Sequence, residues 1–237
     1  MKRILIKLSG EALLANKKSL EPGEIYDADF VNKVAGAIKT CCDEGYEIAL
    51  VIGAGNIWRG RQGTDMDRVS ADRMGMLATA INAIYMKDAL ERIGLSAVVM
   101  TAVPMAPFAE NYSSDAARAA LAQGKVVILG AGLGIPFLST DTTAAVRAAE
   151  VGAEAMFMAK NVSHICAEDP RVNPNAKKFD VVKASEVLAL NLKAIDSTAT
   201  AFCLSVGMPI QVFGLFEPDD IVRAVRGEKV GTLITAE

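Results

Sequence analysis

The feature that most restricts the fold of this chain is a regular alternation of short apolar runs with longer amphipathic segments. The runs are rich in Val, Ile, Leu or Met, as buried strands are, and each is too short for a helix. We therefore predict strands at 4–8, 47–52, 97–100, 126–129, 155–159 and 209–213, with a last short strand near Thr232.

The segments between these runs carry helix signals. One predicted helix begins near Asp27 or Asp29 and ends at Gly45. The others lie at 67–94, as one long helix or two in series, at 113–124, after Ser139, at 194–206 and after Pro218. Strands that alternate with helices predict an α/β fold with a mainly parallel sheet covered on both faces. No repeat or clear linker divides the sequence, so we expect one domain over 1–237.

Charge and composition exclude several classes of protein. The net charge is −3 and the charged residues are interspersed, which argues against a nucleic-acid binder. The four cysteines form no CxxC pair, and the single histidine cannot complete a common zinc site. No apolar stretch reaches the roughly 18 residues that a membrane span needs. We expect a cytoplasmic protein without a membrane partner.

Ligands of doubly wound sheets bind beyond the carboxyl ends of the strands, and glycines follow three of the predicted strands. The first such segment is "KLSG", from Lys7 to Gly10. A lysine in a buried strand is costly unless it has a partner or a role, and Ser9 and Gly10 would let backbone N–H groups approach an anion. The segment is therefore either a phosphate-binding turn with a reactive lysine or an edge-strand lysine beside an ordinary turn.

The second segment is "GAGNIWRG", residues 53–60. Small residues before a helical turn suit a phosphate, and Arg59 could clamp it with two hydrogen bonds. Neither the GxGxxG nor the GxxxxGK[ST] spacing is present, so the glycines could equally serve turn geometry alone. Trp58 is predicted to be a packing residue.

The third segment is "GAGLGIPFLSTD", residues 130–141. Ser139 and Thr140 could cap the next helix or bind a phosphate at its N-terminus. Asp141 could simply favour the helix dipole, or it could orient Lys7 or hold a metal ion. A fourth segment, 159–171, ends in a turn, and its His164 is predicted to be a surface or packed residue.

Together these segments resemble the bacterial UMP kinases of the amino acid kinase family. The matching pieces run in family order over nearly the whole chain: "KRILIKLSGEAL", "VIGAGNIWRG", "ADRMGMLATAINA", "AGLGIPFLSTDTTAAVRAAE", "EDPR", "IDSTATAFC", "PIQVF" and "GEKVGTLI". The resemblance implies a three-layer αβα sandwich. It also implies Mg²⁺-dependent transfer of a phosphoryl group from ATP to UMP, in pyrimidine nucleotide biosynthesis. A homohexamer that responds to GTP and UTP is implied as well.

The resemblance also implies roles for individual residues of this chain. The implied catalytic residues are Lys7, Arg59 and Asp141. The implied ATP-binding residues are Lys7, Leu8, Ser9, Gly10, Gly55, Arg59, Asn161, Cys166 and Asp169. The implied UMP-binding residues are Ala54, Asp72, Leu133, Gly134, Ile135, Pro136, Phe137, Leu138, Ser139 and Thr140. The residues that would contact the metal ion are left open.

The chain departs from the family pattern at both ends of the implied site. Ala54 stands between two glycines where the family usually has a third. The usual AGTGNP is replaced at 131–136, which removes the Thr and Asn side chains there, and the usual VDGVY is replaced at 162–166. Two alternatives therefore stay open: a kinase of the same family with another acceptor, and a non-catalytic nucleotide-binding or regulatory protein.

Overall fold

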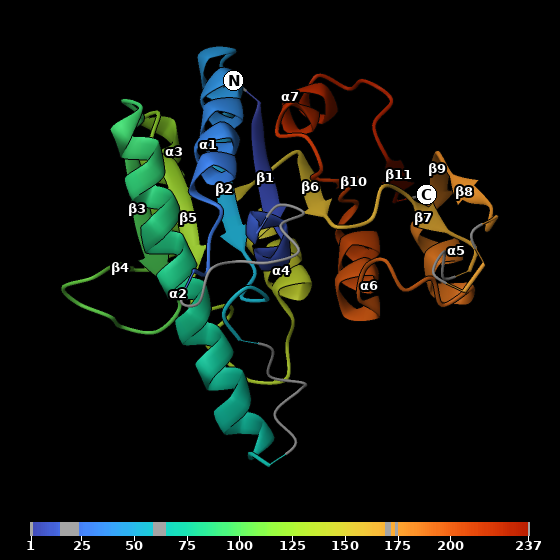
Figure 1. The fold of residues 1–237 in the computed structure, drawn as a ribbon, viewed down its shortest axis with the longest axis horizontal. Coiled ribbons are helices and arrows are strands. Elements are labelled where there is room, and N and C mark those ends of the chain that lie inside the picture. The colour runs from blue at the N-terminus through green and yellow to red at the C-terminus, as the bar shows by residue number, and fades with distance from the viewer. Residues whose placement is uncertain (1, 15–23, 59–64, 169–171, 174, 237) are drawn as a thin grey trace.

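A computed structural model describes residues 2–14, 24–58, 65–168, 172–173 and 175–236. Within them, the central sheet has nine strands in the order β4-β3-β5-β2-β1-β6-β10-β11-β9 (Figure 1). Their bounds are β1 Arg3–Leu8, β2 Glu47–Ile52, β3 Ala97–Thr101, β4 Glu110–Asn111, β5 Val126–Gly130, β6 Ala155–Lys160, β9 Val181–Lys183, β10 Ile210–Gly214 and β11 Thr232–Thr235. Neighbouring strands are parallel except β10 and β11, which confirms the mainly parallel sheet.

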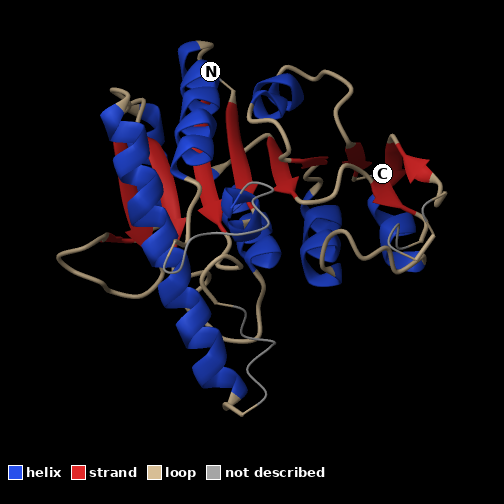
Figure 2. Ribbon diagram, in the orientation of Figure 1, coloured by secondary structure: helices blue, strands red, loops and turns tan. Residues whose placement is uncertain are grey.

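Helices cover both faces of the sheet. One face carries α1 (Ala28–Asp43), α2 (Arg68–Arg92) and α7 (Asp219–Val225), and Figure 2 shows α1 and α2 crossing in front of the strands. The other face carries α3 (Ser114–Ala122), α4 (Thr140–Val151), α5 (Ala184–Ala189) and α6 (Ser197–Val206). The result is the three-layer αβα sandwich that the sequence predicted.

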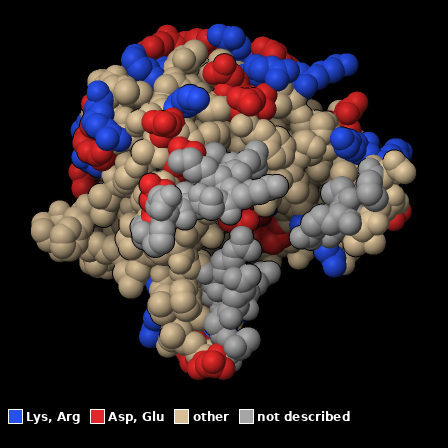
Figure 3. Space-filling model, in the orientation of Figure 1, with Lys and Arg blue, Asp and Glu red and all other residues tan. Residues whose placement is uncertain are grey.

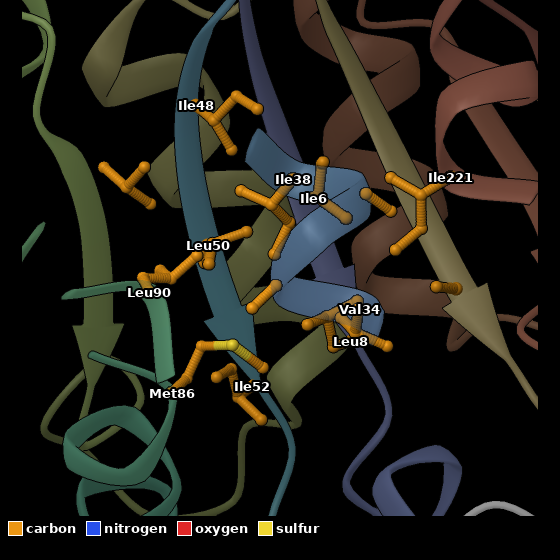
Figure 4. Packing of buried hydrophobic residues seen from close by; sticks show 14 of the residues in the cluster. Ile6, Leu8, Val34, Ile38, Ile48, Leu50, Ile52, Met86, Leu90 and Ile221 are labelled. Atoms are coloured by element: carbon orange, nitrogen blue, oxygen red, sulfur yellow. The ribbon is translucent and has the colours of Figure 1, made fainter. Parts of the chain in front are cut away.

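The two faces of the sheet follow directly from residue alternation along the strands. In β1, Ile4, Ile6 and Leu8 join the core beneath α1 and α2, whereas Leu5 joins the core beneath α4. Figure 4 shows the first of these cores, with Ile6 and Leu50 among side chains from both helices. Alternation places Lys7 on the same face of the sheet as Leu5, which is the face that α4 covers.

The predicted helix ends are confirmed where the sequence offered caps. The Asp27 carboxylate accepts the Phe30 N–H at 3.1 Å at the start of α1, and Gly45 follows its end with φ of 88°. The region 67–94 is one helix, because Asp67 caps α2 and no interruption follows. The helix predicted from 194 instead begins at Ser197, because the Asp196 carboxylate caps it by accepting the Ala199 N–H at 2.7 Å.

Several short elements were not predicted. They are the 3-10 helix η1 (Gly10–Leu14), strands β4 and β9, helix α5, and the antiparallel pair β7 (Ile165–Cys166) and β8 (Lys178–Phe179). The missed strands have two or three residues and the missed helices five or six, so neither an apolar run nor a helical repeat can register in them. No described helix combines the length and the apolar character needed to cross a membrane. The single domain over 1–237 stays a prediction.

On the face shown in Figure 3, Lys and Arg side chains are mixed with Asp and Glu. This mixture agrees with the interspersed charges of the sequence.

Candidate active site

The carboxyl ends of β1, β2, β5 and β6 lie at one edge of the sheet because the four strands are parallel. The loops that follow these strands line three cavities with volumes of about 320, 700 and 110 Å³. The three predicted glycine-bearing segments therefore meet at one place, as the topology requires.

Two lysines and one aspartate form the centre of this region. Lys7 comes from β1, and Lys160 is the last residue of the adjacent strand β6. Asp141 lies in the first turn of α4, above the sheet face that both lysines point toward. Its Oδ1 is 3.0 Å from Lys7 Nζ and its Oδ2 is 2.6 Å from Lys160 Nζ. The 320 Å³ and 700 Å³ cavities are both lined by the two lysines.

Burial and charge compete at this cluster. Burial alone would raise the pKa of Asp141, but the ammonium groups of Lys7 and Lys160 outweigh it and hold that pKa at about 2. Burial lowers the pKa of Lys160, the carboxylate of Asp141 opposes that shift, and the charge of Lys7 adds to it. Asp141 is therefore ionised at neutral pH, and both of its oxygens contact ammonium groups. Of the roles that the sequence left open, this geometry matches the orientation of Lys7.

The position of Asp141 is fixed by the start of α4. Ser139 Oγ accepts the N–H groups of Asp141 and Thr142, each at 3.1 Å, which is the capping interaction predicted from the sequence. The hydroxyls of Ser139 and Thr142 both donate to the carboxylate of Asp196, which itself caps α6. One carboxylate thus joins the N-termini of two helices.

The turns after β1 and β2 pack against each other without room for a side chain. A Cβ on Gly10 would lie 2.5 Å from the Gly53 carbonyl oxygen and 2.6 Å from the Gly55 nitrogen. The buried Asn82 of α2 holds this contact, since its Nδ2 donates to the Gly53 oxygen at 2.6 Å. Ser9, Gly10, Gly53 and Gly55 line the 320 Å³ cavity. Glycines are required here because two backbone segments approach each other closely.

The 110 Å³ cavity lies between α2 and the segment after β5. Six of the residues implied for UMP line it: Ala54, Asp72, Leu133, Ile135, Leu138 and Thr140. Ser139 lines the 700 Å³ cavity instead, and Gly134, Pro136 and Phe137 line none of the three. The Asp72 carboxylate accepts the Phe137 N–H at 2.8 Å and the Arg68 Nε–H at 2.8 Å. The segment is thus folded onto the first turns of α2.

The residues implied for ATP are only partly brought together. Asn161 lines the 320 Å³ cavity and donates to Glu11 at 3.2 Å. The Leu8 side chain faces the core beneath α1, although its carbonyl accepts the Gly53 N–H at 2.8 Å. Cys166 lies on β7 and lines none of the three cavities. Arg59 and Asp169 fall outside the described residues.

Trp58 and His164, which the sequence also singled out, lie outside the Lys7–Asp141–Lys160 cluster. Trp58 packs near Gly75 and donates from its indole N–H to the Ala71 carbonyl at 2.9 Å, as a packing residue would. His164 is half-buried, and its Nδ1 has no partner among the described residues.

Sequence reasoning missed three residues that shape the site: Lys160, Asn82 and Asp196. Lys160 had a usable signal, because it closes the apolar run "AMFMA" just as Lys7 interrupts "ILIKL". Asp196 precedes a helix and could have been read as a cap. Asn82 carried no local signal, since only the tertiary fold brings it to Gly53.

The low pKa of Asp141 makes a prediction about stability. The ionised carboxylate stabilises the fold above about pH 4, and this contribution is lost as the pH falls toward about 2. We expect Asp141→Asn to lower the free energy of unfolding at pH 7 by at least about 2 kcal/mol, since two ammonium groups lose their counter-charge.

Urea unfolding at a series of pH values tests this prediction. The difference in the free energy of unfolding between the variant and the unchanged protein should decrease from pH 4 to pH 2. Asp88→Asn is the matched control, because Asp88 is exposed and its partner among the described residues is Arg92 at 3.3 Å. A gap that stays constant with pH would contradict the electrostatic origin of the effect.

Comparison with known proteins agrees with this architecture. The chain is 34% identical to a UMP kinase from Bacillus anthracis, with a TM-score of 0.92 over 100% of this chain and 96% of that one. It is also 34% identical to a UMP kinase from Ureaplasma parvum, with a TM-score of 0.91 over 99% and 98%. A uridylate kinase from Archaeoglobus fulgidus shares the fold at 23% identity, with a TM-score of 0.74 over 99% and 100%.

The sequence pattern of the amino acid kinase family matches residues 2–214, which includes every residue of the three cavities. Given this match and the buried Lys7–Asp141–Lys160 cluster at the carboxyl edge of a parallel sheet, the chain belongs to the amino acid kinase family.

Proposed function

We propose that this protein is a UMP kinase, which transfers the γ-phosphoryl group of ATP to UMP and releases ADP and UDP. The observation that carries the proposal is the pair of ammonium groups, Lys7 and Lys160, held by one carboxylate beside a glycine-lined cavity. Likeness to two proteins named UMP kinase, each at 34% identity over nearly the whole chain, supports the choice of acceptor.

The ATP phosphates are proposed to occupy the 320 Å³ cavity. Lys7 lines this cavity, and its Nζ donates to Ser9 Oγ at 3.1 Å. Close to it, the turns at Gly10 and Gly55 offer backbone N–H groups to negative charge. Phosphoryl transfer depends mostly on positioning and charge stabilisation. The phosphate of UMP is already an anion at neutral pH, so the reaction needs no strong general base.

Mg²⁺ is proposed to enter with ATP, where it would neutralise phosphate charge. Among the described residues, no group of three or more His, Cys, Asp or Glu side chains is placed to hold a metal ion. Both oxygens of Asp141 contact ammonium groups. This donor set suits a metal ion carried by the phosphates better than one resident in the protein.

UMP is proposed to bind between α2 and the segment after β5. Asp72 is suited to the ribose hydroxyls because a carboxylate accepts two hydrogen bonds. It already accepts from Phe137 and Arg68, so a nucleotide must share or replace these contacts. Leu133 and Ile135 bring apolar side chains to this cavity, so backbone groups are left to recognise the base.

A coupled assay of ADP release decides the acceptor. We expect turnover with UMP and little with CMP, dUMP or no acceptor. Turnover with a different acceptor, such as aspartate or carbamate, would point to another kinase of the family. ATP binding without turnover of any acceptor would favour the non-catalytic alternative.

Lys7→Ala tests the chemical role of the cluster. We expect it to lower kcat by roughly 10²-fold or more, because charge on the transferring phosphoryl group loses a fixed ammonium. UMP binding should stay largely intact in a titration of the variant. Lys39→Ala is the control, since Lys39 pairs with Asp43 on the surface of α1, away from the cavities. Near-normal turnover of Lys7→Ala would rule out the role.

A homohexamer is proposed from the family resemblance, and α2 offers a surface for self-association. Met74, Leu77, Ile81 and Ile84 recur every three or four residues, and each is between 38% and 55% exposed. This spacing forms one apolar stripe along a helix. We further propose a cytoplasmic enzyme of pyrimidine nucleotide biosynthesis with GTP and UTP as effectors.

The molar mass from light scattering, measured as the protein elutes from a size-exclusion column, tests the role of this stripe. Ile81→Glu should produce smaller assemblies because it places a charge in the apolar contact. Val206→Glu on α6, at 46% exposure against 48% for Ile81, is the matched control and should leave the mass unchanged. An unchanged mass for Ile81→Glu would exclude the stripe as the interface.

A further inference from the structure

We propose that Lys160 is a second phosphate-binding residue of the reaction: Asp141 holds it, and the phosphates of ATP replace its contact with the Ala194 carbonyl. The inference rests on the proposed function and assigns a role to a residue that the sequence analysis did not single out.

Lys160 is placed beside Lys7 at the cavity proposed for the ATP phosphates. Lys160 and Lys7 stand on neighbouring parallel strands, and their ammonium groups contact opposite oxygens of one carboxylate. Both lysines line the 320 Å³ cavity together with Ser9, Gly10 and Gly55. A phosphate in this cavity therefore meets ammonium groups from two strands rather than one.

The charges of the three residues in direct contact do not balance. Asp141 is the one carboxylate that Lys7 and Lys160 share, so these three residues together carry one positive charge in excess. Ion pairs that only support a fold match their charges, because an uncompensated buried charge is costly. The excess is open to the cavity, where an anion would compensate it. A polyphosphate is the anion that the proposed reaction brings there.

Burial lowers the pKa of Lys160, and the carboxylate of Asp196, at the start of α6, acts to raise that pKa and so offsets part of this charge. Its oxygens contact the hydroxyls of Ser139 and Thr142 and an N–H of α6, so it acts on Lys160 from a distance and not through a direct ion pair. Lys193 also lines the 320 Å³ cavity and adds positive charge, while Glu11 lies across it and accepts from Asn161. Among the described residues, Lys7 is the ammonium group that acts on Lys160 together with Asp141 and Asp196.

Lys160 has a second contact besides Asp141. Its Nζ donates to the carbonyl of Ala194, in the loop that leads to α6. A neutral carbonyl is a weaker partner for an ammonium group than a phosphate oxygen is. ATP can therefore take Lys160 from this carbonyl without taking it from Asp141.

In the transfer step, the bond between the γ-phosphorus of ATP and its bridging oxygen breaks, and the bonding electrons leave with ADP. A bond forms between the γ-phosphorus and a phosphate oxygen of UMP. Lys160 keeps its proton throughout and stabilises the charge on the phosphate oxygens, so the step needs no further reactant.

Steady-state kinetics of Lys160→Met and Lys160→Arg test the proposal. Lys160→Met keeps much of the length but not the charge, and we expect kcat to fall by about 10²-fold while KM for UMP changes little. Lys160→Arg should recover part of the loss. Lys39→Met is the control, because it removes a surface ammonium group. A folded Lys160→Met protein with kcat near that of the unchanged enzyme would overturn the proposal.

The pH dependence of kcat/KM for ATP distinguishes a phosphate-binding role of Lys160 from a purely structural one. Burial disposes Lys160 to lose its proton at high pH, so kcat/KM for ATP should fall on the alkaline side. Arginine stays protonated, so Lys160→Arg should move that fall to higher pH. An alkaline limb that does not move in Lys160→Arg would overturn the assignment.

Titration of each protein with MgATP in the absence of acceptor keeps this inference distinct from the proposed function. If the unchanged protein phosphorylates no acceptor, the proposed function fails. The MgATP titration then decides by itself whether Lys160 contacts the phosphates. Weakening of MgATP binding by about tenfold or more in Lys160→Met supports a phosphate contact. Equal affinity of the two proteins overturns it.

Discussion

The structure of the site depends on one buried carboxylate shared by two ammonium groups. Asp141 would be unstable as an anion in this position without Lys7 and Lys160, and neither lysine would tolerate burial without Asp141. The three residues come from β1, α4 and β6, so the cluster forms only when the sheet and its covering helix are assembled. The charge cluster of the site therefore forms in the same step as the packing of α4 onto the sheet.

The parallel sheet supplies the accuracy of this arrangement. Adjacent strands in register bring Lys7 and Lys160 to one face, and the glycine turns after β1 and β2 bring backbone within 2.5 Å of where a Cβ would stand. Asn82 then ties the β2 turn to α2, which carries Asp72 further along the same helix. The two proposed nucleotide sites thus share one rigid framework.

Much of the fold could be predicted because its longer elements carry strong local patterns. The core strands and caps such as Asp27 and Ser139 are signalled by residues next to them in sequence. The short strands and α5 were missed because tertiary contacts, not periodicity, create them. The site was predicted in the same uneven way: motifs indicated Lys7 and Asp141, whereas the contact between Asn82 and Gly53 joins residues that only the fold brings together.

Asp196 binds the side chains of Ser139 and Thr142 at the start of α4 and also begins α6. The two helices are therefore fastened at the ends that face the cavities, and not only through their packed sides. A displacement of α6 that keeps these hydrogen bonds also displaces the first turn of α4, which carries the Asp141 carboxylate. The hydrogen bonds of Asp196 thus couple the width of the 700 Å³ cavity to the position of the charge at its centre.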